Sequence, residues 1–267
     1  MPAVVKAAWG ALAYNMERDG QRYAGLVVAE TLHLLKSAIE SGERNTLTLN
    51  NMAEDYMLKR NVYPACKGYR PAFHAKAYEY AICLSVNHEI VHGIPRADKN
   101  LRNGDIVGID IVGLFEGWHA DAAITVPVGE VSNQARKLIK WTESALIRGI
   151  KQVKLGGTTG DIGFAIQNHA KKKGLGVAKY LAGHGIGHEI HCAPSIPNIG
   201  KSSTGAVLEG DISLCIEPML TLGSDATHVH DDTWTIVTSD GSLAAHFEHT
   251  VLLKKNGELE ILTKLPV

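Results

Sequence analysis

The stretch GIDIVGLFEGWHADAAIT, residues 108–125, is predicted to form a β-hairpin that turns at the Glu-Gly pair 116–117. Side chains two residues apart in a strand share a face, and glycine in a two-residue loop favours a tight hairpin turn. With the turn at this pair, Val112 faces Asp121 across the hairpin. Asp110 shares a face with Val112, so Asp110 and Asp121 become diagonal neighbours with backbones ~7–8 Å apart.

The two acids of this hairpin stand in apolar surroundings. Isoleucines at positions 109, 111 and 124 flank them, so both faces of the strands are expected to be covered. Two carboxylates on a covered face are costly without a cation, and their separation suits a pair of metal ions ~3.5–4 Å apart. Solvated surface acids are the alternative interpretation.

Three further side chains are candidate metal ligands. Glu217 ends an apolar run and precedes a proline, which favours extended backbone, and Glu248 stands in the strand-like HFEHTVLL. His184 stands in GHGIGHEIH, where glycines allow close backbone approach. Carboxylate oxygens with one imidazole suit Mn²⁺, Fe²⁺, Co²⁺ or Zn²⁺. The glycine spacing does not match the dinucleotide-binding fingerprint, so a phosphate loop is not favoured.

An internal echo links the two parts of the chain. NGDIVGIDI at 103–111 resembles EGDISLCIEP at 209–218, since each has Gly-Asp-Ile, a short apolar run and then isoleucine with a carboxylate, Asp110 or Glu217. Two related halves would each deliver an acid to a shared centre. Chance similarity between two buried strands is the alternative.

The stretch NHEIVHGIP, residues 87–95, contains the H-E-x-x-H pattern of zinc peptidases. That pattern binds zinc only on a helix, where residues four apart share a face. Here β-branched residues crowd the motif and a glycine and a proline follow at once, so extended or turn backbone is favoured. In a strand, His88 and His92 would lie ~13 Å apart, too far for one zinc ion.

Composition places the chain among ordinary soluble proteins. It has 267 residues and a formal net charge of −1, so no nucleic-acid electrostatic footprint is present. The four cysteines lack C-x-x-C spacing and are expected to be buried, reduced thiols. The start, MPAVVKAAWGALAY, has no signal-peptide layout, and no apolar run is long enough for a membrane span. We therefore expect a cytoplasmic protein.

Periodicity and turn signals predict an alternation of helices and strands. Helices are predicted over 19–41, from 50 or 51 onward, over 133–153, and from a cap at 158 or 159 to Gly174. Strands are predicted at 81–86, 105–115, 118–128, 178–182, 212–216, 233–237, 247–253 and 259–262.

In five stretches the sequence resembles the type I methionine aminopeptidases: SVNHEIVHGIP, NGDIVGIDI…WHADAAIT, GHGIGHEIH, IEPM and FEHTVLL. The resemblance covers residues 19–264. It implies an α+β pita-bread fold, with two pseudo-symmetric halves around a curved antiparallel sheet and helices on the outer face. It also implies one catalytic domain over 1–267, with a short N-terminal lead at 1–18.

The resemblance implies a dinuclear site for two divalent ions per chain (Co²⁺, Mn²⁺, Fe²⁺ or Zn²⁺). Its ligands would be Asp110, Asp121, His184, Glu217 and Glu248. Asp121 and Glu248 would bridge the ions, His184 and Glu217 would hold one ion, and Asp110 would hold the other. A monovalent cation near Asn87 is a further expectation.

The activity implied is removal of the N-terminal methionine from nascent proteins and peptides, through a hydroxide bridging the two metals. Glu217 would carry the proton, His191 would stabilise the tetrahedral intermediate, and His92 would lie near the scissile peptide. His88 would have no part in metal binding. The substrate pocket would comprise Cys66, Tyr69, Tyr78, Cys83 and Trp234, together with His92 and His191. The partner would be a chain beginning with methionine, with the ribosome as a further expected partner, no membrane and a monomeric state.

Two departures from the family pattern lie near this pocket. The segment RPAFHAKA, 70–77, is several residues longer than the usual family loop, and Ile190 stands where phenylalanine is common. Both concern substrate preference and leave the ligands unchanged. The alternatives are an Xaa-Pro peptidase of the same fold and a non-catalytic binding protein that has kept the fold.

Overall fold

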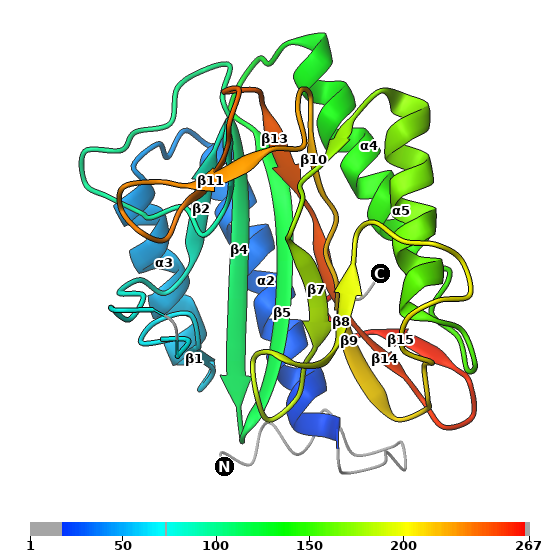
Figure 1. The fold of residues 1–267 in the computed structure, drawn as a ribbon. Helices are drawn as coiled ribbons and strands as arrows, with labels where there is room; N and C mark the ends of the chain where they lie inside the picture. Colours follow the sequence, from blue (N-terminus) through cyan, green and yellow to red (C-terminus); the bar gives the residue numbers. More distant parts are fainter. Residues whose placement is uncertain (1–17, 73, 265–267) are drawn as a thin grey trace.

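The computed structural model describes residues 18–72 and 74–264, so nearly all of the N-terminal lead lies outside the described residues. Its centre is a nine-stranded antiparallel sheet (Figure 1). The strands are β1 (Tyr63–Pro64), β2 (Cys83–Val86), β4 (Ile106–Phe115), β5 (Trp118–Pro127), β7 (Ala182–Gly185), β8 (Cys192–Pro197), β9 (Ile212–Ile216), β14 (Glu248–Leu253) and β15 (Leu259–Ile261). The order is β1-β4-β5-β14-β9-β7-β8, with β2 paired to β4 and β15 paired to β14.

The order of the central strands explains the internal echo. The two echo segments become β4 and β9, which flank the central pair β5 and β14 from opposite sides. Asp110 lies on β4, and Glu217 directly follows β9. The sheet therefore brings one acid from each half toward the junction of β5 and β14, as two related halves would.

In the described part of the chain, four helices cover the sheet: α2 (Asp19–Glu40), α3 (Thr46–Lys59), α4 (Asn133–Ile150) and α5 (Thr159–Lys173). α2 packs on β4 and β5, and α4 packs on α5 and on several strands of the other half. Figure 1 shows α2 and α3 with one half and α4 and α5 with the other. Each half has its own hydrophobic core, centred on residues such as Leu35, Ile109, Leu146 and Val251.

Two smaller sheets complete the fold. One has the order β13 (Ala244–His246), β10 (Met219–Thr221), β6 (Gly176–Val177), and the other has the order β11 (Thr227–Val229), β12 (Ile236–Thr238), β3 (Glu89–Val91). The second sheet confirms that H-E-x-x-H is extended, because its central residues form β3. His88 is exposed at the start of this strand.

The predicted hairpin at 108–125 is confirmed in detail. β4 and β5 pair in the expected register, with Val112 opposite Asp121. Glu116 and Gly117 form the turn, with φ of 48° and 82°. Positive φ at both central residues matches the right-handed twist of the flanking strands.

Helix ends were predicted well where a cap was recognised. Thr158 caps α5 in a reciprocal capping box with Asp161, and Gly174 closes the helix in a left-handed conformation. The predicted start of α3 near residue 50 was wrong. The helix begins at Thr46, because the Asn45 side chain accepts the backbone N–H of Thr48 and caps the first turn.

Two strand predictions also failed for local reasons. Residues 178–181 are not a strand, and β7 begins only at Ala182, since Tyr180 has a φ of 67° that a strand cannot contain. β12 begins at Ile236 rather than at 233. The Asp232 carboxylate accepts the backbone N–H groups of Trp234 and Thr235, which holds these residues in a turn.

Within the described ranges, no helix combines the length and the apolar character needed to cross a membrane.

Candidate metal centre and adjoining pocket

Five strands or strand ends bring the predicted ligands to one small cavity of about 130 Å³. Its lining includes all five: Asp110, Asp121, His184, Glu217 and Glu248. These side chains come from β4, β5, β7, the end of β9 and the start of β14. The convergence that the hairpin register predicted for two acids therefore extends to the complete set.

The central strand pair sets the place of two of these acids. Glu248 pairs with Ala123, two residues from Asp121, so the two carboxylates are diagonal neighbours on one face. Thr250 locks the register, since its hydroxyl exchanges 2.8 Å hydrogen bonds with the backbone N–H and C=O of Asp121. Both carboxylates are buried.

His184 presents a free ring nitrogen to the cavity. Its Nδ1 lies 2.9 Å from the carbonyl oxygen of Gly185 and donates to it. This places the imidazole lone pair on Nε2, which lies 3.5 Å from Oε1 of Glu217. Burial lowers the pKa of His184 to about 4, so the ring is neutral, as a metal ligand requires.

The four acids are unfavourable neighbours in the absence of a cation. Burial raises the pKa of Asp110 to about 7. Burial, and then the charges of neighbouring acids, raises the pKa of Asp121, Glu217 and Glu248 well above ordinary values. A divalent cation reverses this effect, because it stabilises the ionised form of every carboxylate around it.

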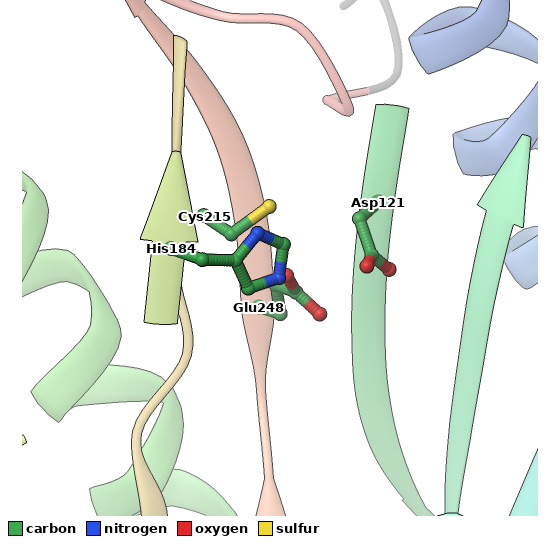
Figure 2. Close-up of side chains that lie close together, drawn as sticks. All are labelled: Asp121, His184, Cys215 and Glu248. Atoms are coloured by element: carbon green, nitrogen blue, oxygen red, sulfur yellow. The ribbon is translucent and has the colours of Figure 1, made fainter. Parts of the chain in front are cut away.

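Unsatisfied polar atoms fit a metal in this cavity. Among the described residues, Oδ1 of Asp121 and Oε1 of Glu248 are buried without a hydrogen-bond partner. Buried polar atoms without partners are rare in native proteins and indicate a missing ion or water. Figure 2 shows Asp121, His184 and Glu248 turned toward one another, with Cys215 behind them. The ligand atoms of these four residues all lie within 4.8 Å of one another.

Two residues at this site were not predicted to be part of it. Cys215 is buried, as are Cys66 and Cys83, whereas Cys192 is exposed, so the expectation of buried thiols was wrong for Cys192. Burial and then nearby acids raise the pKa of Cys215, so it stays protonated beside the acids. His246 is buried, with Nε2 3.7 Å from Oε2 of Glu217 and 3.9 Å from Oε2 of Glu248. Its position two residues before Glu248 was the available signal, because residues two apart in extended backbone share a face.

His92 and His191 line the same cavity, and both also line a larger pocket of about 460 Å³ that opens from it. Burial, and then the neighbouring histidines, lowers the pKa of His92 to about 4. Burial also lowers the pKa of His191, whose Nδ1 lies 2.7 Å from the Tyr69 hydroxyl. Both rings are therefore neutral near pH 7. His88 does not line either cavity.

The larger pocket contains every side chain predicted for substrate binding: Cys66, Tyr69, Tyr78, Cys83 and Trp234. Ile190 and Val112 add apolar surface. The unusual 70–77 segment reaches this pocket through Pro71 and His74. The His74 ring stacks on Trp234 with centroids 3.8 Å apart, and its Nε2 lies 2.9 Å from the carbonyl oxygen of Thr233.

Asn87, expected near a monovalent cation, has its side chain engaged within the protein. It donates to Asp105 and accepts the Ile106 N–H. The cation itself stays a prediction.

Taken together, the antiparallel pita-bread fold and the buried acid-and-histidine centre beside an apolar pocket define a metal-dependent hydrolase. The family model of metallopeptidase family M24 matches residues 19–255. The chain belongs to this family and, within it, to the methionine aminopeptidases.

Individual relatives agree with this assignment. The chain is 40% identical over 249 residues to the methionine aminopeptidase of Clostridium acetobutylicum, covering 93% of this chain and 96% of the relative. The crystal structure of the methionine aminopeptidase of Thermotoga maritima superposes with a TM-score of 0.88 at 38% identity, covering 95% of this chain and 99% of that one. The prolidase of Pyrococcus furiosus shares the fold alone, with a TM-score of 0.70 at 21% identity, covering all of this chain and 69% of that one.

Proposed function

We propose that this chain is a methionine aminopeptidase that removes the first methionine from peptides and nascent chains, using two divalent metal ions in one catalytic domain. The observation that carries the proposal is the junction of two cavities. A small acidic cavity that would hold metal opens into a larger pocket lined mainly by apolar and aromatic side chains. The first cavity suits the reacting peptide bond, and the second suits the methionine side chain.

The five cavity ligands divide by position. Asp121 and Glu248, as central neighbours, would bridge two ions, while His184 and Glu217 would hold one and Asp110 the other. Divalent ions at such a site supply a nucleophilic water at neutral pH and polarise a carbonyl oxygen. The oxygen-rich donor set accepts Co²⁺, Mn²⁺, Fe²⁺ or Zn²⁺, so metal identity is a matter for measurement.

Glu217 is the proposed proton carrier. It is the ligand at the end of β9, and its carboxylate lies between the imidazoles of His184 and His246. In this role it takes a proton from the attacking water and later delivers it to the leaving amine.

His191 is the proposed hydrogen-bond donor to the reacting carbonyl oxygen. When the Tyr69 hydroxyl donates to Nδ1, the single proton of the neutral ring lies on Nε2. That proton can then stabilise negative charge as it develops on the oxygen. His92, which lines the same pocket, would contact the substrate near the scissile peptide.

The pocket itself fits a long, flexible apolar side chain. Cys66, Cys83 and the aromatic rings of Tyr69, Tyr78 and Trp234 provide surface that suits the polarisable methionine thioether. Ribosome association, a monomeric state and a cytoplasmic location are further elements of the proposal, consistent with processing of new chains.

An Xaa-Pro peptidase is the second candidate, because prolidases share this fold. Parallel assays of the metal-loaded protein on Met-Ala-Ser and Ala-Pro-Ala separate the two functions. We expect release of methionine from the first peptide and no release of alanine from the second. The opposite preference would contradict the proposal, and cleavage of neither would favour a binding role.

A further inference from the structure

The motif NHEIVH contains one residue whose role the metal centre does not explain. The glutamate of an H-E-x-x-H zinc peptidase acts as general base, but here Glu89 lies on β3 and does not line the metal cavity. Its carboxylate instead forms an ion pair of 2.5 Å with the ammonium group of Lys99. Both side chains are largely buried, with 16% and 11% of their surface exposed. Burying two charges is costly, so further contacts must compensate for this ion pair next to His92.

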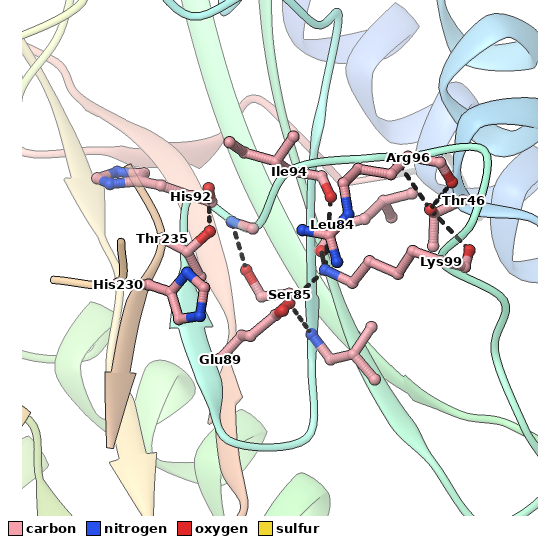
Figure 3. Close-up of polar contacts among 12 residues, drawn as sticks. Thr46, Leu84, Ser85, Glu89, His92, Ile94, Arg96, Lys99, His230 and Thr235 are labelled. Carbon is pink, nitrogen blue, oxygen red and sulfur yellow. Dashed lines mark hydrogen bonds and ion pairs between the residues drawn. The ribbon is translucent and has the colours of Figure 1, made fainter. Parts of the chain in front are cut away.

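The pair ties together three stretches of backbone (Figure 3). Oε2 of Glu89 accepts the N–H of Val86 at 2.7 Å. The Lys99 ammonium donates to the carbonyl oxygens of Leu84, at 3.0 Å, and Ile94, at 3.5 Å. One ion pair therefore connects β2, β3 and the segment that follows His92.

The segment around His92 needs such support. His92 has a φ of 59°, which is unfavourable for a residue with a side chain. Gly93 follows, and a Cβ atom there would lie 2.3 Å from the carbonyl oxygen of Leu84, so this backbone runs directly against β2. Two hydrogen bonds hold it there: the Leu84 N–H donates to the Gly93 oxygen, and the Gly93 N–H donates to the Ser85 hydroxyl.

Strand β2 also pairs with a strand that carries a proposed metal ligand. β2 pairs with β4, and Cys83 is opposite Asp110. The Glu89–Lys99 pair thus fastens the His92 backbone to the strand next to a proposed metal ligand. The far end is also anchored, because the Lys99 carbonyl oxygen accepts the N–H of Thr46 at the start of α3.

We propose that the Glu89–Lys99 ion pair is a positioning device that holds residues 92–94 against β2 and so fixes the His92 ring in the substrate pocket. The proposal rests on the proposed function for its catalytic consequence, but the placement of the ring can be measured independently. Lys99 and Glu89 are positioning residues, since neither lines the pocket.

The test compares Lys99→Met with Arg22→Met in the full-length, metal-loaded protein. Arg22 is a matched control: its side chain is 10% exposed and pairs with Glu260, joining α2 to β15. Four quantities are measured: kcat and KM on Met-Ala-Ser, Co²⁺ affinity by calorimetry, and the Cε1–H NMR signal of His92, identified by its loss in His92→Asn.

We expect Lys99→Met to lower kcat by about tenfold and to shift the His92 signal, because small misplacements of a catalytic group have large rate effects. Co²⁺ affinity should stay within about twofold, and Arg22→Met should change none of the four quantities. An unmoved His92 signal with unchanged kcat would overturn the proposal, as would an equal loss of kcat in Arg22→Met. If Lys99→Met does not fold, Glu89→Gln carries the same expectations, since its amide oxygen can still accept the Val86 N–H. A wild-type protein that releases no methionine contradicts the proposed function, while the NMR signal still decides the positioning role.

Discussion

Asp121 on β5 and Glu248 on β14 lie diagonally across the junction between the two halves of the molecule, where Glu248 pairs with Ala123. Each has one buried oxygen without a hydrogen-bond partner. The two halves meet where two acids need a cation, and the remaining ligands surround that point.

Removing one of these acids should separate metal binding from folding. Asp121→Asn keeps the shape of the side chain but removes the charge of a proposed metal ligand, so we expect Co²⁺ affinity and methionine release to fall by at least about tenfold. In chelator, the same variant should melt at an equal or higher temperature than wild type, because like charges are relieved. Calorimetric titration and thermal melts provide both measurements. A variant that binds Co²⁺ like wild type would contradict the ligand assignment.

The stability of the metal-free protein should fall as pH rises from about 6.5 to 8. The carboxyl groups of the centre have folded pKa values above their unfolded ones, with Asp110 at about 7, so the folded state binds more protons and loses stability as they ionise. Buried histidines such as His92 and His184 have lowered folded pKa values of about 4 and contribute the opposite slope, but only below their unfolded pKa of 6.5. Above that value the acids dominate.

Thermal melts across this pH range, with chelator and with Mn²⁺, check the prediction. The decline should be much reduced with metal bound, since a cation keeps the carboxylates ionised in the folded state. A melting temperature that rises with pH in the chelated protein would contradict the account of the acids.

The two histidine assignments make opposite predictions. His191→Ala should lower kcat by about 10²–10³-fold, the usual effect of losing a donor to a developing oxyanion, with little change in metal affinity. His88→Ala should leave kcat within about twofold, because His88 is exposed and lies outside both cavities. Steady-state kinetics on Met-Ala-Ser measures both. Inactivity of His88→Ala would revive the zinc-peptidase interpretation of H-E-x-x-H.

The 70–77 segment should affect substrate affinity rather than chemistry. His74→Ala removes the ring that stacks on Trp234 at the pocket, a contact worth ~0.5–1.5 kcal/mol. We expect KM for Met-Ala-Ser to rise by about 2- to 12-fold with kcat unchanged. His33→Ala, at an exposed position on α2, is the control. A fall in kcat without a change in KM would place His74 in the chemistry instead.

The hairpin and its acid pair could be predicted because every determinant was local. The two-residue repeat of strand geometry defined the faces, the Glu116-Gly117 pair defined the turn, and the register of Asp110 and Asp121 followed from these. Glu217, Glu248 and His184 were recognisable as candidate ligands. That they converge on one site could be predicted only from the family resemblance, because hydrophobic periodicity does not determine the order of β5, β14, β9 and β7 in the sheet.

What the sequence did not reveal depends on contacts between distant segments or on side chains that override propensity. Helix α3 begins earlier than predicted because Asn45 caps it, and β12 begins later than predicted because Asp232 holds the preceding residues in a turn. The Glu89–Lys99 pair depends on the close approach of Gly93 to β2, which no local pattern encodes. His246 was not predicted as a site residue, because a single histidine next to a phenylalanine in a strand is typical of an ordinary core position.

The most direct test of the central claim is methionine release by metal-stripped and reconstituted protein. Purified protein is treated with chelator, divided, and assayed on Met-Ala-Ser without metal and with Mn²⁺ or Co²⁺ added back. The account predicts no free methionine without metal and sustained release on addition of either ion. Release that persists in excess chelator, or no release with any divalent ion from a protein that remains folded, would contradict it.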